Sequence, residues 1–172
     1  MRRLVQIAAL LMVALPAVAQ TAAWISDAKS GCRVWNIYPE AGETMSWSGA
    51  CRDGTADGRG VVQYSHQGKS GGRYEGDYKR GMLQGRGVYL FPSGSRYEGE
   101  FRDSQFNGQG TMSRADGGRS YVGQWSGDRP NGQGTYTAPN GDIFTGAWTN
   151  GCFKQGNRTA RLMASAKDCG FD

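Results

Sequence analysis

The feature that most constrains the fold is an internal repeat. Five times, a glycine stands two residues after an aromatic residue and two residues before an aromatic residue or a cysteine. These central glycines are Gly49, Gly76, Gly99, Gly123 and Gly146, which lie 27, 23, 24 and 23 residues apart. Self-similarity with a period of about 20 to 50 residues is typical of arrays whose units cannot bury a core alone. The repeat therefore predicts a series of similar small units.

Each unit predicts a β-hairpin. In the block Tyr97–Phe101, alternation places both rings and Gly99 on one face of a strand, with Glu98 and Glu100 on the other. A strand glycine allows another group to approach closely, and we expect that group to be an aromatic ring from the neighbouring strand. In the first four units a Gly-x-Gly pair follows the central glycine and indicates the second strand: Gly58/Gly60, Gly85/Gly87, Gly108/Gly110 and Gly132/Gly134.

Turn residues such as Pro139-Asn140-Gly141-Asp142 separate the units. A hairpin of this size buries too little apolar surface to fold alone, so stability must come from contacts between neighbouring units. We therefore predict an all-β fold. It is an elongated single-layer antiparallel meander of about five hairpins, with a short C-terminal capping helix.

The motifs also carry a family resemblance. The blocks YEGDYKRGMLQGRGVYLFPSG, YEGEFRDSQFNGQGTM and YVGQWSGDRPNGQGTYTAPNG resemble MORN (membrane occupation and recognition nexus) repeats, which are hairpins built on Y-x-G-x-[FYW] followed by G-x-G. The resemblance covers residues 47–157, although Cys51 replaces the second aromatic of the first unit and Gln155-Gly156-Asn157 replaces Gly-x-Gly in the last. It implies a twisted sheet with a grooved face. It also implies kinship with scaffolding, membrane-junction and oligomerising proteins.

The first 19 residues predict a secretory signal peptide. Arg2 and Arg3 precede an apolar run that begins at Ile7, and Ala17-Val18-Ala19 before Gln20 matches a small-residue cleavage site. The apolar run is short for a membrane span. We therefore expect an exported protein, either in the periplasm of a Gram-negative bacterium or outside the cell.

The segments on either side of the array are expected to cap it. Residues 20–46 predict a flexible lead, up to about residue 30, followed by a capping strand within Cys32–Tyr38. Residues 158–172 predict a capping helix and tail, with Asn157 as N-cap of a helix from Arg158 to Asp168. Capped ends would keep the edge strands from pairing with other chains.

Four cysteines predict two disulfides, which persist in oxidising compartments. Three pairings are possible. We favour Cys32 with Cys51 and Cys152 with Cys169, because each pair brackets one end of a long array. A zinc site is disfavoured, since no C-x-x-C spacing occurs and His66 is the only histidine. No metal and no cofactor is expected.

The sequence offers little sign of catalysis. His66 has no recognisable catalytic partner, and no G-x-S-x-G motif occurs. Glu75, Asp77, Glu98 and Glu100 recur on the polar face, where paired acids could serve a glycosidase. Their recurrence with the repeat favours cross-strand pairing with Arg or Gln instead. Basic residues are scattered without a long run, which disfavours nucleic-acid binding. We predict a protein that is not an enzyme.

We favour a protein-binding or scaffolding module whose aromatic groove holds a peptide, a partner protein or a second copy. The alternative is a binder of envelope lipid or glycan that uses basic turns such as Lys69 and Lys79-Arg80. A carbohydrate-active enzyme is the weakest alternative. For each ring, packing inside the sheet competes with a role in the groove. The candidate groove residues are Tyr74, Tyr78, Tyr97, Phe101, Tyr121, Trp125, Phe144 and Trp148.

Overall fold

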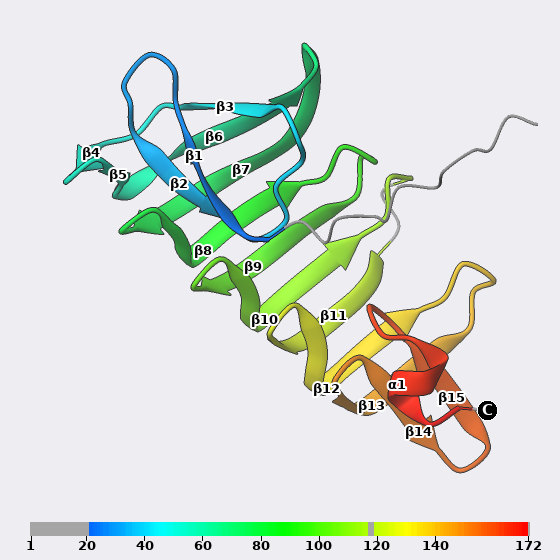
Figure 1. Ribbon diagram of the computed structural model, residues 1–172. Coiled ribbons are helices and arrows are strands. Elements are labelled where there is room, and N and C mark those ends of the chain that lie inside the picture. The colour runs from blue at the N-terminus through cyan, green and yellow to red at the C-terminus, as the bar shows by residue number, and fades with distance from the viewer. Residues whose placement is uncertain (1–20, 117–118, 172) are drawn as a thin grey trace, which may run out of the picture.

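The computed structural model describes residues 21–116 and 119–171, so the predicted signal peptide (residues 1–19) lies outside the described part. Within that part, the main element is an antiparallel sheet of eleven strands (Figure 1). Each strand from β6 to β14 pairs with the next in the sequence, and β3 pairs with β6 at one edge. The strands are β3 (Glu43–Trp47), β6 (Gly58–His66), β7 (Lys69–Lys79), β8 (Met82–Leu90), β9 (Arg96–Arg102), β10 (Gln105–Ser113), β11 (Arg119–Ser126), β12 (Arg129–Thr137), β13 (Ile143–Thr149), β14 (Cys152–Gln155) and β15 (Arg158–Arg161). This order confirms the predicted antiparallel meander.

A row of paired glycines crosses the sheet and explains the repeated motif. In register, the row runs through Gly60, Gly76, Gly87, Gly99, Gly110, Gly123, Gly134 and Gly146. The side chain of Tyr97 lies over this row, because a Cβ added at Gly99 would meet its hydroxyl and a Cβ added at Gly110 would meet its hydroxyl and ring atoms. Tyr97 then donates a hydrogen bond from its hydroxyl to the Glu100 carbonyl, over 3.0 Å. The glycines therefore make room for a tyrosine. For Gly110 the ring comes from the neighbouring strand, as predicted, whereas for Gly99 it comes from the same strand.

The rings also contact one another along the array. Tyr97 meets Phe101 edge to face at 5.1 Å between ring centroids, and meets Trp125 of the next hairpin at 5.3 Å. Trp125 in turn meets Tyr121 at 5.0 Å, and Tyr121 meets Trp148 at 5.5 Å. Edge-to-face contacts at these distances are favourable. We call the sheet face that carries these rings the ring face, and the opposite face the outer face.

The N-terminal end is more ordered than the sequence predicted. β1 (Ala23–Ser26) and β2 (Arg33–Asn36) pair with each other, and β2 also pairs with β5 (Thr55–Ala56), which pairs with β4 (Cys51–Arg52). The prediction of a flexible lead up to about residue 30 was therefore wrong. The Asp27 carboxylate fixes the turn after β1 by accepting hydrogen bonds from the Lys29 N–H and the Ser30 hydroxyl.

The C-terminal end differs from the predicted helix. Residues 158–161 form β15, which pairs with β14 through a two-residue turn at Gly156 and Asn157. Gly156 has a φ of 58°, which suits the first position of such a turn. The helix α1 spans only Ala166–Cys169, and its N-cap is Ser165 rather than Asn157. Residues 158–161 therefore pair with the edge of the sheet instead of forming the helix that the spacing of the apolar residues predicted.

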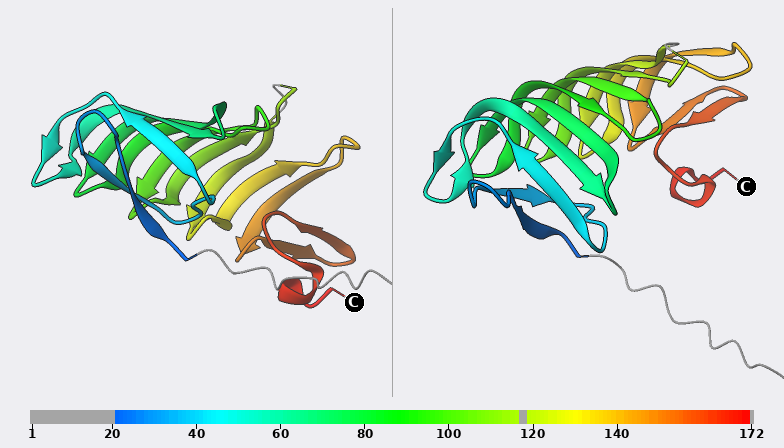
Figure 2. Two further views of the ribbon diagram at one scale, coloured as in Figure 1. Left: turned by 45° about the horizontal axis from the view of Figure 1, so that its top comes forward. Right: turned by 90° about the horizontal axis from the view of Figure 1, so that it is seen from above.

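Both ends lie on the ring face of the sheet. Figure 2 shows β1 and β2 at one end of the curved sheet and β15 with α1 at the other, on the same side. Among residues 21–116 and 119–171, no helix is both long and apolar enough to cross a lipid bilayer.

Both predicted disulfides form. Cys32 is bonded to Cys51 and Cys152 to Cys169, with Cα atoms 5.8 and 5.5 Å apart. One disulfide joins Cys32, the residue before β2, to Cys51 of β4, and the other joins Cys169 of α1 to Cys152 of β14. The two disulfides indicate an oxidising compartment.

Candidate functional site

The structure places seven of the eight predicted groove rings in the core. Tyr74, Tyr97 and Tyr121 have no exposed surface, and Tyr78, Phe101, Trp125 and Trp148 are at most 3% exposed. Only Phe144 is partly buried rather than buried. These rings pack against the glycine row and against one another, so they do not line an open groove. Packing within the sheet is therefore their observed role.

A different set of residues lines a groove on the ring face, with a volume of about 480 Å³. Its floor consists of Tyr64 from β6, Tyr89 from β8, Phe91 directly after β8, and Phe106 from β10. The Tyr89 and Phe91 rings lie 4.8 Å apart, and Phe91 contacts Phe106 at 6.2 Å. Tyr89 and Phe91 are only partly buried. We call this hollow the ring-face groove.

The segment Trp35–Glu40 forms one side of the groove, which we call the N-terminal wall. The Asn36 amide donates a hydrogen bond of 2.8 Å to the Glu43 carboxylate. His66 Nδ1 lies 3.1 Å from the Glu40 carboxylate. These contacts hold the wall against β3 and β6. Burial raises the pKa of Glu43 above its ordinary value, against the opposing effect of its hydrogen bonds.

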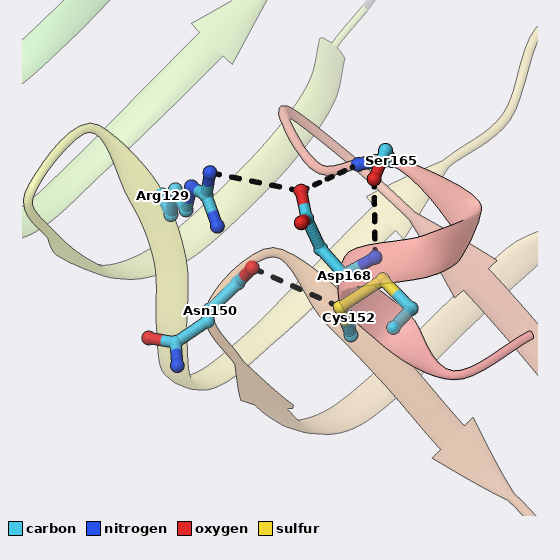
Figure 3. Close-up of polar contacts among 6 residues, drawn as sticks. Arg129, Asn150, Cys152, Ser165 and Asp168 are labelled. Atoms are coloured by element: carbon cyan, nitrogen blue, oxygen red, sulfur yellow. Dashed lines mark hydrogen bonds and ion pairs between the residues drawn. A yellow bond between two sulfur atoms is a disulfide. The ribbon is translucent and has the colours of Figure 1, made fainter.

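Arg129 and Met163 lie at the opposite side, which we call the C-terminal wall. Figure 3 shows Arg129 directed toward Asp168 of α1, at a distance of 3.8 Å. Asp168 also accepts a hydrogen bond from the Ser165 N–H, and its own N–H donates to the Ser165 hydroxyl. These hydrogen bonds, with Arg129 a smaller contribution, lower the pKa of Asp168. The disulfide of Cys152 and Cys169 anchors this wall to the sheet.

A ladder of turns links the two walls. In four two-residue hairpin turns, the second residue has a positive φ and donates its N–H to a carbonyl of the preceding hairpin. The donors are Gly81, Ser104, Asp128 and Gly151, and the acceptors are Ala56, Leu83, Phe106 and Pro130.

The walls join this ladder at its ends. The Trp35 N–H donates to the Gly81 carbonyl, and the Leu162 N–H donates to the Gly151 carbonyl. The two middle positions of the ladder are not glycine, although both have a positive φ, which favours glycine. Ser104 has a φ of 66° and Asp128 a φ of 65°. Each compensates with its side chain: Leu83 N–H donates to the Ser104 hydroxyl, and Phe106 N–H donates to Asp128 Oδ1.

Asp128 also lines the groove. Its second oxygen, Oδ2, is buried and has no hydrogen-bond partner among the described residues. Burial raises the pKa of Asp128, although hydrogen bonds from the Phe106 N–H and the Gln105 side chain oppose the shift. Asp128, Glu40 and Glu43 were not among the predicted site residues. Aligning the turns of the repeats would have revealed Asp128, because it stands where two other hairpins have glycine.

We expect Asp128→Asn to stabilise the protein at about pH 7 and to leave its stability unchanged at about pH 3. Asparagine keeps an acceptor for the Phe106 N–H and tolerates a positive φ. Because the folded-state pKa is raised, ionisation is unfavourable in the fold. This cost is present above the folded-state pKa and vanishes below the unfolded-state value of about 3.9. Thermal unfolding followed by circular dichroism at both pH values measures the difference. A lower melting temperature at pH 7 would contradict the expectation.

The acids of the outer face have structural partners. Glu75 pairs with Arg73 at 2.9 Å and Glu98 pairs with Arg96 at 2.6 Å, in each case two residues apart on one strand. The predicted cross-strand pairing is therefore replaced, for these two, by pairing along the strand. Glu100 does reach across, accepting the Gln109 N–H at 3.0 Å.

The basic turns predicted for lipid binding lie at opposite ends of one strand, because β7 begins at Lys69 and ends at Lys79. They therefore do not form a single patch. In the described part of the chain, no group of three or more His, Cys, Asp or Glu side chains is placed to hold a metal ion.

Comparison with known proteins agrees with the geometry. The family model described as MORN repeat matches three consecutive segments, residues 74–96, 97–119 and 121–143. They correspond to the hairpins β7–β8 and β9–β10, and to β11–β12 with the loop that follows it. No curated protein matches the chain. MORN repeats are protein- and membrane-binding modules and are generally non-catalytic. Residues 74–143 therefore belong to the MORN repeat family.

Proposed function

We propose that this protein is a non-catalytic protein-binding module that holds a segment of its partner in the ring-face groove. The observation that carries the proposal is the groove itself. It combines a floor of partly exposed rings, Tyr89 and Phe91, with two walls held by disulfides. Concave, largely apolar sites with a few polar groups are typical binding sites.

The shape of the groove supports a protein segment as the ligand. The terminal segments that carry the two walls lie on the same side of the sheet (Figure 2), and residues of both walls line the groove. Tyr38 on the N-terminal wall is 73% exposed and Met163 on the C-terminal wall is 44% exposed. These apolar side chains would contact a chain lying on the floor. Exposed apolar residues around a groove are typical of interaction sites.

A photo-crosslinking experiment tests the proposal. A benzophenone amino acid replaces Phe91 in the groove or, as a matched control, Val122, which is 40% exposed on the outer face. We expect a partner to be crosslinked in the native cells from position 91 and not from position 122. Equal yields at both positions, or no adduct at position 91 in a folded protein, would contradict a role for the groove. An adduct with a second copy would identify self-association.

We also propose that the protein is exported and works in the periplasm or outside the cell. The two disulfides support this location. The predicted signal peptide agrees with it. Fractionation of the native cells tests the proposal, since the mature chain should begin at Gln20 and accumulate outside the cytoplasm.

A further inference from the structure

We propose that the ring-face groove selects a basic, apolar segment of its partner protein, with lysine or arginine side chains placed near Glu40, Glu43 and Asp128. This inference rests on the proposed function and specifies the chemistry of the partner. It comes from the contrast between the charge of the groove and the charge of the whole chain.

The groove is acidic although the protein is basic. The sequence carries a formal net charge of +5, which becomes +3 when Arg2 and Arg3 of the predicted signal peptide are removed. The groove lining nevertheless contains three carboxylates, Glu40, Glu43 and Asp128, against one arginine, Arg129. Arg129 is directed toward Asp168 of α1, at 3.8 Å. Scattered basic residues elsewhere on the surface would repel a cationic ligand, so the acidic lining directs it to this face.

Within the described residues, no lysine or arginine pairs with the carboxylates of the groove. Glu43 accepts hydrogen bonds from neutral donors, the Asn36 amide and the Glu40 N–H. Asp128 accepts one from the Phe106 N–H, and its Oδ2 has no partner in the described part of the chain. Glu40 faces His66, which carries charge only when protonated. Burial raises the pKa of both Glu43 and Asp128, because no lysine or arginine in the described ranges pairs with them to offset the loss of solvent around their negative charges. A cationic side chain of the ligand would stabilise these carboxylates.

The apolar floor of the groove can also contact the methylene groups of a lysine or arginine side chain of the ligand. Lysine and arginine bury their methylene groups against apolar surfaces while their charged ends reach polar groups. The partly buried rings of Tyr89 and Phe91 offer such a surface, and their faces attract cations. Acidic protein segments and anionic lipid headgroups would be repelled by the three carboxylates. The two walls also keep a flat bilayer from the floor.

Three fluorescein-labelled peptides of equal length test the inference by fluorescence anisotropy at low salt. All contain the same leucines, separated by lysine, serine or glutamate. We expect the leucine–lysine peptide to bind most tightly and the leucine–glutamate peptide to bind most weakly. Each peptide is measured against the wild-type protein and two triple variants.

The groove variant carries Glu40→Gln, Glu43→Gln and Asp128→Asn. The matched control carries Glu75→Gln, Glu98→Gln and Glu100→Gln, which remove three carboxylates from the outer face. We expect the groove variant to lose about tenfold in affinity for the leucine–lysine peptide, equivalent to about 1.4 kcal/mol. The control should lose little, and binding of the leucine–serine peptide should not change with either variant. Circular dichroism confirms that both variants are folded.

The outcomes separate this inference from the proposed function. Suppose the leucine–serine peptide binds the groove and the groove variant binds the lysine peptide as wild type does. The groove then recognises apolar chain alone, and this inference fails while the proposed function stands. Equal losses in both triple variants would also overturn the inference, because the effect would then come from overall charge. If a Phe91→Ala variant binds every peptide as wild type does, both proposals fail.

Discussion

Replacing Gly99 with alanine should destabilise the array by about 3 kcal/mol or more, since overpacking alone typically costs about 1 to 3 kcal/mol. Gly99 lies in the middle of the glycine row, outside the left-handed region of φ. A Cβ there would lie 2.6 Å from the Gln109 carbonyl oxygen and 2.6 Å from the Gly110 Cα. Both atoms belong to the backbone of β10, so relief would require breaking the pairing of β9 with β10. Urea denaturation measures the free energy of unfolding.

Gly71→Ala is the matched control. Gly71 is also a strand glycine, but its nearest contact for a Cβ is the Tyr64 carbonyl oxygen at 3.2 Å. The neighbour needs to move only slightly, and alanine reduces the entropy of the unfolded chain, so we expect a change of under about 1 kcal/mol. If both variants lost the same stability, the close approach across the glycine row would not be the cause.

Removing the disulfide between Cys32 and Cys51 should lower the free energy of unfolding by about 3 kcal/mol, the chain-entropy value for a loop of this size. The bond spans 19 residues of sequence and ties β2 to the first hairpin. The double variant Cys32→Ala and Cys51→Ala avoids a free thiol. A melting temperature lower by about 6 to 12 °C is expected for a domain of this size. Amide exchange at Val34, which is fully buried, should accelerate most.

The C-terminal disulfide supplies the comparison. Cys152→Ala with Cys169→Ala should free α1, which has no buried residue of its own, and should leave exchange at Val34 slow. This pattern would show that each disulfide stabilises its own wall. Unchanged exchange at Val34 in the Cys32/Cys51 variant would mean that strand pairing alone holds the N-terminal wall.

The repeated part of the fold could be predicted from the sequence because its contacts are local and recur. Tyr97 contacts Gly99 of its own strand and Gly110 of the strand paired with it, so the motif contains its own packing partners. The disulfides were predictable for a related reason: an elongated array keeps its two ends apart.

The ends of the array were harder to predict, because contacts distant in sequence decide them. β2 exists because the Arg33 N–H donates to the Gly54 carbonyl and the Trp35 N–H to the Gly81 carbonyl. β15 exists because β14 offers it a sheet edge, despite an apolar spacing typical of a helix. Tertiary contacts override local propensity in both places.

The groove could not be predicted from ring positions alone. Regular alternation places Tyr89 on the same face as Tyr97, and the two are directly paired in register. Only their neighbours distinguish them, since Tyr97 lies over glycines of the row and has no exposed surface, whereas Tyr89 is partly buried beside the N-terminal wall. The acidic character of the groove arises in the same way, because the turn at Asp128 and the wall at Glu40 come to line one groove only in the folded chain.

The ladder of turns has a consequence for the size of ligand that the protein accommodates. Each wall is fastened to the nearest hairpin by the same kind of hydrogen bond that fastens one hairpin to the next. The number of hairpins between the walls therefore sets the distance between the walls and the length of the groove. A homologue with one more unit would hold its walls farther apart over otherwise identical contacts, and would select a longer segment without any new recognition chemistry.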